Sequence, residues 1–338
     1  MCIRDRCVDA EGIVVAVFRQ HSSRRLDPQL HTHAVIANRV KAPDGRWLAL
    51  DARTIKMDQR TLSGLYHAGL RTELTRRLGV RWHPAVNGIS EMVGVDPEVL
   101  AEFSQRSREV DKRVDEKLDR FRIDLDREPT PRERWRLERE AVLDSRPAKT
   151  HGHAAGELHT GWCSRLGGLD FEPNDIAART VGRVRRATGI DQQTMAHMID
   201  GALEALGERQ STWRPAELVR ELAAQVPTDV TVESDRLCSF LQDLANHVAA
   251  DRCVDLYPAI PEGAVVRRDG RPISEAAVDR ALTTEAILKE EERIVEWAER
   301  QRRYADIIDT TPRDLDVEGL SAGQAEACRA AAGMAPLE

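Results

Sequence analysis

The feature that most constrains the fold is the alternation of His31 and His33 within Leu30-His31-Thr32-His33-Ala34-Val35-Ile36-Ala37-Asn38. β-Branched residues in this run are typical of a strand. Because strand side chains alternate between two faces, His31 and His33 share one face, about 6–7 Å apart. Two imidazoles at that separation bind one divalent cation if a neighbouring strand supplies a third ligand. The sequence therefore predicts a sheet that carries part of a metal site.

Two more segments are expected to join this sheet. Residues 12–20 form a β-branched run, and residues 47–51 follow a turn with a Pro-Asp-Gly signature over residues 41–46. Short connections favour antiparallel neighbours. We therefore expect a three-stranded antiparallel meander with the histidine strand in the middle.

The apolar period then changes from two to about four. The positions that carry it end at Gly79, a helix C-cap signal, and are Leu62, Tyr66, Leu70, Leu74 and Leu78. This pattern predicts a helix with that stripe, Tyr66 included, in the core. The fold class is α+β: a small antiparallel sheet covered by helices, followed by a mainly helical region.

Other helices are expected further along the chain. Val110, Val114, Leu118 and Leu125 mark one stripe of a long charged helix, and Thr130-Pro131-Arg132-Glu133 is a capping-box pattern that opens the next. Residues 150–175 are predicted to be loop-rich, and residues up to about 250 mainly helical. Thr284 is expected to cap a helix that buries Ile287, Leu288, Ile294 and Val295.

Charge is distributed unevenly along the chain. The chain has a net charge of −7, but residues 1–85 carry 15 Lys and Arg against 8 Asp and Glu, a net of +7. A basic segment around the histidine strand favours a polyanionic ligand. Chance enrichment in arginine is the alternative explanation.

The cysteines and the hydropathy indicate in which cellular compartment the protein is expected. The six cysteines are scattered without a CxxC pair, which predicts reduced thiols in a cytoplasmic protein. No run of about 18 apolar residues occurs, so we expect no membrane insertion.

Several sequence motifs, in the same order along the chain, resemble those of one protein family. Phe18-Arg19-Gln20-His21-Ser22-Ser23-Arg24, Asp27-Pro28-Gln29-Leu30-His31-Thr32-His33 and Asp44-Gly45-Arg46-Trp47 are similar to conjugative relaxases of the TrwC/TraI (MobF) type. Matches continue through Phe103-Ser104-x-Arg106, Asp144-Ser145-Arg146 and Trp162. The resemblance covers about residues 10–172, roughly the C-terminal half of that relaxase domain.

The resemblance implies a histidine-hydrophobe-histidine (HUH) endonuclease. In this family a three-histidine site holds a divalent metal (Mg²⁺, Mn²⁺ or Zn²⁺) that polarises a phosphate of single-stranded plasmid DNA at the transfer origin. A tyrosine near the N-terminus then attacks and forms a phosphotyrosyl intermediate. The implied partners are this DNA, relaxosome accessory proteins and coupling proteins. Arg24 and Lys149 match basic positions and are candidate DNA contacts, or only solvated surface charges.

The sequence departs from the family at the third metal ligand. Alignment on Phe18 and Asp27 places Gln20 at the position of the third histidine, and His21 follows one residue later. A shift of one residue moves a side chain to the other face of the strand, so His21 reaches the metal only through a local bulge or a twist at the strand end. An amide oxygen from Gln20 suits Mg²⁺ or Mn²⁺ better than Zn²⁺. The expected metal site is therefore His31 and His33 with Gln20 or His21.

The nucleophile of the family is the second departure. The only tyrosines are Tyr66, Tyr257 and Tyr304, and all of them follow the histidine strand. We therefore expect no catalytic tyrosine in this chain and no covalent DNA adduct from it. A second metal cluster of His151, His153 and His159 is possible in sequence, but its glycine-rich setting favours a solvent loop.

The end of the chain resembles a helicase. Gly319-Leu320-Ser321-Ala322-Gly323-Gln324 is similar to the glutamine motif ahead of a superfamily 1 (RecD-like) helicase core, for which ATP is expected, and no P-loop follows. We expect an interior fragment of a longer relaxase-helicase. Its predicted parts are an artefactual leader (1–9), the relaxase segment (10–172), a helical linker (173–282) and the helicase start (283–338).

Two other functions remain open from the residues. A metal-dependent hydrolase of the amidohydrolase type also carries Thr-His-x-His-like strings, but it needs an eight-fold alternation of strands and helices. A DNA-binding adaptor that keeps the fold without the chemistry is the non-enzymatic alternative.

Overall fold

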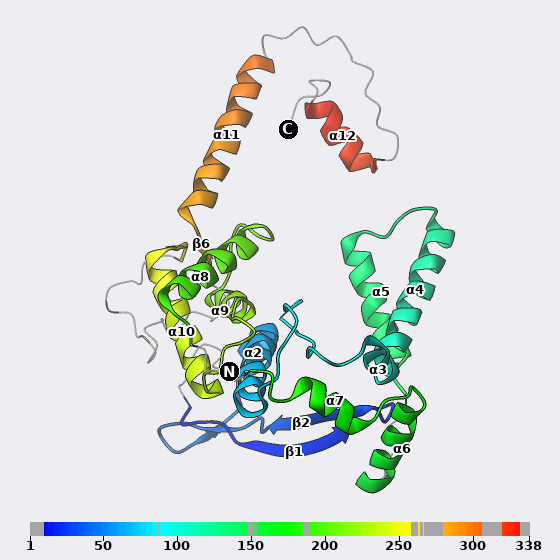
Figure 1. Cartoon of the computed structure of the whole chain (residues 1–338). Helices are drawn as coiled ribbons and strands as arrows, with labels where there is room; N and C mark the ends of the chain where they lie inside the picture. Colours follow the sequence, from blue (N-terminus) through cyan, green and yellow to red (C-terminus); the bar gives the residue numbers. More distant parts are fainter. Residues whose placement is uncertain are drawn as a thin grey trace.

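The computed structural model describes residues 10–86, 88–147, 152, 154–184, 189–257, 263, 266, 280–305 and 320–331. Its strands are short and antiparallel and its helices predominate, which confirms the α+β class (Figure 1). The strands are β1 (Val15–Ser22), β2 (Pro28–Ile36), β3 (Val40–Lys41), β4 (Trp47–Leu48), β5 (Val254–Asp255) and β6 (Leu282–Thr283). The first helices are α1 (Arg53–Met57), α2 (Gln59–Leu78), α3 (Pro97–Glu102), α4 (Gln105–Leu125), α5 (Pro131–Asp144) and α6 (Ala155–Gly167). The later helices are α7 (Pro173–Thr180), α8 (Gln192–Gly207), α9 (Pro215–Ala224), α10 (Ser234–Asp251), α11 (Glu285–Ala305) and α12 (Ala322–Ala331).

The histidine strand pairs with the strand before it, as expected. In the β1–β2 hairpin Phe18 lies opposite His33 and Gln20 lies opposite His31. The predicted three-stranded meander is wrong, because β4 pairs with β3 in a separate two-stranded sheet. The turn between these strands explains the difference. Gly45 adopts a φ of 83°, and the Ala42 N–H donates to the Arg46 carbonyl, which folds β4 back onto β3.

The helix predicted to end at Gly79 is α2, and Gly79 is its left-handed C-cap with a φ of 65°. The predicted buried stripe is wrong: Leu62, Tyr66 and Leu70 are 51%, 58% and 40% exposed. The opposite face is buried instead and consists of small or polar residues, namely Thr61, Ala68, Gly69, Arg71, Thr72 and Thr75. A Cβ on Gly69 would lie 3.3 Å from the Ser234 Cβ. The close approach of α10 therefore selects small residues here rather than leucines.

The main hydrophobic core lies between α2, α8, α9 and α10. Leu206, Leu218, Leu222, Leu237 and Leu241 are at most 1% exposed in it. This confirms the mainly helical region predicted up to about residue 250. Since Ala68 of α2 belongs to the same core, the predicted boundary at residue 172 separates segments that pack together.

The helix after Thr284 is α11, and the Thr284 hydroxyl accepts from the Ile287 N–H as expected for a cap. Ile287 packs against the core, but Ile294 and Val295 are each 57% exposed. The prediction that these two are buried is wrong, because α11 extends away from α8 after its first turns (Figure 1).

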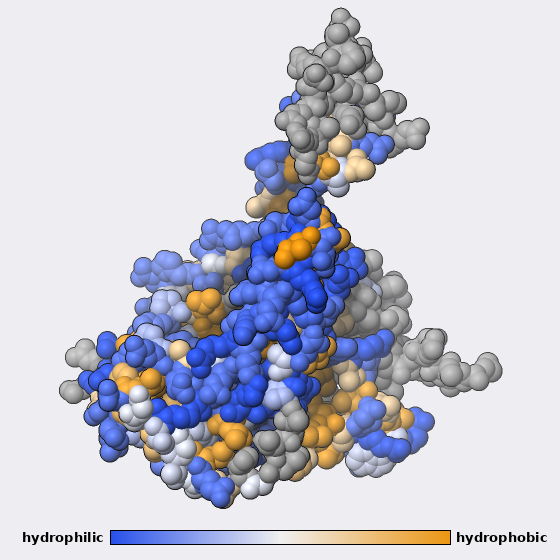
Figure 2. Space-filling view, turned by 90° about the vertical axis from the view of Figure 1, so that its right-hand side faces the viewer, coloured by the Kyte–Doolittle hydropathy of each residue, from blue (hydrophilic) through white to orange (hydrophobic). Residues whose placement is uncertain are grey.

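The long charged helix and its successor form the pair α4 and α5. The capping box that opens α5 is confirmed: the Thr130 hydroxyl accepts from the Glu133 N–H and the Glu133 carboxylate accepts from the Thr130 N–H. Leu118, Phe121 and Leu137 form the small core between the helices. Ion pairs such as Lys117–Asp144, 2.8 Å, cover the outside. The face of the molecule that carries α4 to α6 is mainly hydrophilic (Figure 2).

The loop-rich segment predicted over residues 150–175 contains α6 and the first residues of α7, so this prediction is wrong for most of its length. The sequence of α6 hides the helix, because Gly156, Gly161 and Gly167 lie in it and Ala154 offers no capping side chain. The helix is held instead by hydrogen bonds to residues far away in the sequence.

No helix among the described residues is long and apolar enough to cross a membrane. The described cysteines, Cys163, Cys238, Cys253 and Cys328, are unpaired thiols. The leader predicted over residues 1–9 lies outside the described residues.

Candidate metal and phosphate site

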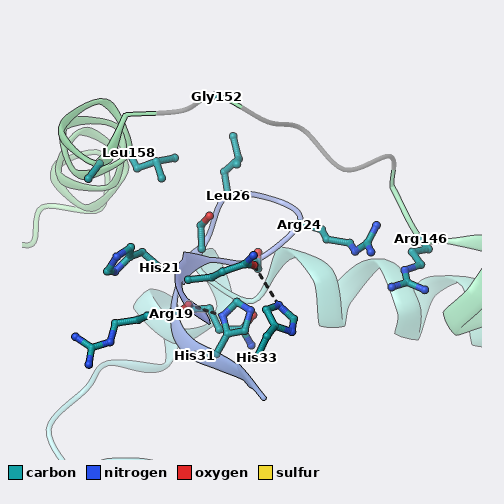
Figure 3. A pocket seen from close by; sticks show the side chains of 14 residues that line it. Arg19, His21, Arg24, Leu26, His31, His33, Arg146, Gly152 and Leu158 are labelled. Atoms are coloured by element: carbon teal, nitrogen blue, oxygen red, sulfur yellow. Dashed lines mark hydrogen bonds between the residues drawn. The ribbon is translucent and has the colours of Figure 1, made fainter. Parts of the chain in front are cut away.

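His31 and His33 lie side by side on one face of β2, as the alternation predicts (Figure 3). Their ring centroids are 5.0 Å apart. The Nδ1 of His31 lies 2.9 Å from the Gln29 carbonyl oxygen. Since a carbonyl can only accept, Nδ1 carries the proton and the Nε2 lone pair of His31 is left for a ligand bond. This arrangement, with one ring nitrogen on a carbonyl and the other free, is the usual one for metal-binding histidines.

Gln20 of β1 lies on the same face as the two histidines. Its Oε1 is 3.2 Å from the Nε2 of His33, the contact drawn as a dashed line in Figure 3. Two ligands that each lie about 2.1 Å from one cation are separated by about 3.0–3.4 Å. An amide oxygen only accepts, so without a metal this contact is a hydrogen bond from the His33 Nε2–H to the Gln20 Oε1; its length of 3.2 Å also lies within the range for two ligands of one metal ion.

His21 lines the same pocket from the end of β1. The strand register shifts between Gln20 and Ser22, which is the irregularity that His21 needs to leave its expected face. Among the described residues no group of three His, Cys, Asp or Glu side chains is placed to share a metal. In this conformation Gln20, rather than His21, is the side chain in contact with the histidine pair.

These residues line a pocket of about 570 Å³. Its described lining includes three histidines and three arginines and no carboxylate; the residues are Arg19, Gln20, His21, Ser22, Ser23, Arg24, Leu26, Gln29, His31, His33, Arg146, Gly152, Ala155 and Leu158. Cationic and hydrogen-bonding groups without a nearby acid are suited to a phosphate.

Two arginines from distant segments lie at one end of the pocket (Figure 3). Arg24 belongs to the β1–β2 turn, and its Nη1 donates to the Pro147 carbonyl over 3.2 Å. Arg146 lies two residues after the end of α5 and lines the pocket as well. Arg24 was a candidate from the sequence, whereas Arg19 and Arg146 were not. The predicted contact Lys149 lies outside the described residues, as do His151 and His153.

The β1–β2 turn that carries Arg24 has a defined internal structure. The Ser23 N–H donates to the Asp27 carbonyl (2.9 Å) and the Leu26 N–H donates to the Ser23 carbonyl (3.0 Å). Leu26 has a φ of 61°, in the left-handed region that costs a residue with a Cβ about 1–2 kcal/mol. Asp27, only 2% exposed, closes the turn.

The other predicted residues do not reach this pocket. Tyr66 is exposed on α2, and none of the described tyrosines lines the pocket. His159 lies on α6 with its Nδ1 3.8 Å from the Cys163 sulfur.

The hairpin with two histidines on one face, beside clustered arginines, is the candidate site. Residues 4–169 match the family model described as TrwC relaxase. This part of the chain belongs to the TrwC relaxases, the MobF family of conjugative relaxases.

Individual relatives show the same likeness. The multifunctional conjugation protein TraI of Escherichia coli (strain K12) is 33% identical over 108 residues, 29% of this chain and 6% of that protein. A solved structure of the conjugative relaxase TrwC with oriT DNA, metal-free, is 28% identical with a TM-score of 0.39, and covers 47% of this chain and 53% of that one. A metal-bound TrwC structure with oriT DNA is 28% identical, TM-score 0.38, over 47% and 52%. The chain thus spans a small part of TraI and about half of the TrwC structures.

Proposed function

We propose that this chain supplies the metal- and phosphate-binding part of a conjugative relaxase that nicks single-stranded DNA at a plasmid transfer origin. The observation that carries the proposal is the pocket in which His31, His33 and Gln20 share one face beside Arg24 and Arg146. The amidohydrolase alternative is not favoured, because the described strands form three separate two-stranded antiparallel sheets and no parallel barrel.

The donor set fits a divalent cation. His31 and His33 would hold it through ring nitrogens, and Gln20 or His21 would complete the protein ligands. When bound, such a cation withdraws charge from a phosphate and stabilises the charge that develops on it during attack. Two imidazoles with an amide oxygen favour Mg²⁺ or Mn²⁺, and His21 in place of Gln20 would favour Zn²⁺.

The arginines would hold the DNA backbone. Guanidinium groups pair with phosphate oxygens in a fork that a water-exposed lysine does not offer. Arg24 and Arg146 at one end of the pocket would fix the phosphate next to the metal, and Lys149 remains a predicted contact. Accessory and coupling proteins are proposed partners of the intact relaxase.

We expect that none of the tyrosines of this chain is the nucleophile of the nicking reaction. Since none of the described tyrosines lines the pocket, we expect no phosphotyrosyl adduct when this chain is incubated with Mn²⁺ and labelled single-stranded DNA. Denaturing gels that show a covalent adduct would contradict this expectation.

The helicase start remains a proposal, as does its need for ATP. In the structure the predicted motif forms a helix cap: the Gln324 Oε1 accepts from the Ser321 N–H, and the Gln324 N–H donates to the Ser321 hydroxyl. These reciprocal bonds explain the pairing of serine and glutamine by helix capping alone.

The pocket's role is tested by the binding of fluorescein-labelled oligothymidylate, measured by anisotropy with and without Mn²⁺. We expect Mn²⁺ to tighten binding, and Arg24→Ala and Arg146→Ala each to weaken it; Arg293→Ala on α11 is the matched control. Equal affinity for the wild type and both pocket variants would refute the proposal. Binding that responds to Arg24 but not to Mn²⁺ or to His31→Ala would favour the DNA-binding adaptor.

A further inference from the structure

Helix α6 holds the β1–β2 turn through two side chains that lie three residues apart on one helix face. The indole N–H of Trp162 donates to the Leu26 carbonyl over 2.6 Å. The Nη2 of Arg165 donates to the Asp27 carboxylate over 3.0 Å. Both partners belong to the turn, although 136 and 138 residues separate them from α6 in sequence.

The Asp27 side of the second contact is buried. The Asp27 side chain is 3% exposed, and it also accepts from the Gln105 N–H at the start of α4. Arg165 in turn donates to the Glu102 carboxylate (2.8 Å) and lies over the Phe103 ring. Because both oxygens of the buried Asp27 carboxylate accept hydrogen bonds, Asp27 links the turn to α4 and α6, and Arg165 extends this link to α3.

The turn needs such support because of Leu26. Its backbone is left-handed, with a φ of 61°, and a leucine side chain has no polar group to stabilise that conformation locally. The bond from Trp162 ends on the carbonyl of this same residue. Without it, only the hydrogen bonds within the turn and the contacts of Asp27 would oppose relaxation of Leu26 to a negative φ.

We propose that Trp162 and Arg165 are positioning residues that hold the Leu26 turn in its left-handed form and so direct Arg24 into the phosphate pocket. This inference rests on the proposed function, since it assigns to α6 the alignment of a phosphate-binding arginine. Arg24 is two residues before Leu26, and both line the pocket. His31 and His33 lie on β2 beyond the turn, so the histidine pair is held separately.

The first test is a comparison of Trp162→Phe, which removes only the indole N–H from an aromatic side chain, with Trp297→Phe on α11 as the control. We expect Trp162→Phe to weaken oligothymidylate binding in metal-free buffer about five-fold, the usual effect of one lost hydrogen bond. Mn²⁺ affinity should stay unchanged. The control should alter neither quantity.

Two double variants test the route of the effect. In an Arg24→Ala background Trp162→Phe should cause no further loss of oligothymidylate affinity, because the two act through one group. Adding Leu26→Gly to Trp162→Phe should restore oligothymidylate affinity, because glycine adopts the left-handed conformation without the hydrogen bond from Trp162. Losses that add up, or a failure of Leu26→Gly to rescue, would overturn the inference.

A measurement on the turn itself separates this inference from the proposed function. Hydrogen exchange at the Leu26 and Asp27 amides should accelerate in Trp162→Phe, and also in Arg165→Lys, whether or not DNA binds. Unchanged exchange in both variants would show that Trp162 and Arg165 do not hold the turn. If exchange is faster but Arg24→Ala leaves oligothymidylate affinity unchanged, the role of Trp162 and Arg165 in holding the turn is upheld and the proposed function is refuted instead.

Discussion

At the scale of residues, Gln20 is the proposed third ligand of the metal. It lies opposite His31 in the ladder and its Oε1 contacts the Nε2 of His33, so a change at this position would alter the proposed third ligand alone. We expect Gln20→His to raise Zn²⁺ affinity about tenfold or more, since even changes outside the ligand shell shift metal affinity by that much. Isothermal titration of Zn²⁺ and Mn²⁺ measures the effect.

His21 provides the matched comparison for Gln20. We expect Gln20→Ala to weaken Mn²⁺ binding and His21→Ala to leave it nearly unchanged. The reverse result, with Mn²⁺ binding abolished only in His21→Ala, would show that the bulge after Gln20 brings His21 to the metal.

Arg24 is expected to contact phosphate and not bases. If so, Arg24→Ala should weaken binding of single strands of different sequence by a similar factor, and it should reduce the salt slope by about 1. A sequence-dependent loss with an unchanged slope would contradict a phosphate contact. Anisotropy titrations over a series of salt concentrations check both.

Some residues of the candidate site could be placed from the sequence, and others could not. The shared face of His31 and His33 follows from a period of two. The alignment on Phe18 selects Gln20, which lies opposite His31 in the ladder, and its role as a metal ligand remains a prediction. Arg146 and Trp162 could not be placed in this way. Their positions depend on how α5 and α6 pack against the hairpin, and the local pattern of apolar residues does not predict that packing.

At the scale of elements, local signals succeed where a cap or turn specifies the backbone. The Gly79 cap of α2 and the capping box of α5 were predictable for that reason. The buried face of α2 was not, because its partners α9 and α10 come more than a hundred residues later and approach too closely for large side chains. A leucine stripe alone therefore indicates a helix but not which side of it is covered.

A substitution at Gly94 tests how closely the segment after α2 packs against α7. Its φ is 101°, and an added Cβ would lie 2.8 Å from the Arg179 carbonyl oxygen. Gly88 has a similar positive φ of 80°, with nothing within 4 Å of such a Cβ. We expect Gly94→Ala to lower the free energy of unfolding by about 1–3 kcal/mol more than Gly88→Ala does. Urea unfolding measures both, and equal losses would show that only the backbone conformation matters.

At the scale of the whole molecule, α2 joins the relaxase segment to the helical core. Glu73 contributes to this junction: its carboxylate accepts from Arg77 (2.6 Å) and Arg76 (2.8 Å) on its own helix and from the Ser234 N–H of α10 (3.2 Å). The predicted boundary at residue 172 therefore runs between segments that share a core, and the domain division remains a prediction.

This junction gives the stability a pH dependence. Hydrogen bonds from Arg77, Arg76 and the Ser234 N–H lower the pKa of Glu73 from 4.5 to about 2. Because the folded-state pKa is the lower one, the stabilisation is complete above pH 4.5 and is lost as the pH falls towards 2. We expect Glu73→Gln to flatten the stability profile over this range, and Glu98→Gln, an exposed change on α3, to serve as the control. A Glu73→Gln profile as steep as the wild type would contradict this assignment.

We propose above all that the β1–β2 hairpin holds one divalent cation through His31 and His33. This is tested by titration of Mn²⁺ into the full chain, followed by electron paramagnetic resonance. We expect one tight Mn²⁺ site that is lost in His31→Ala and in His33→Ala and retained in His159→Ala on α6. A tight site that survives the double variant of His31 and His33 would show that the hairpin does not hold the cation.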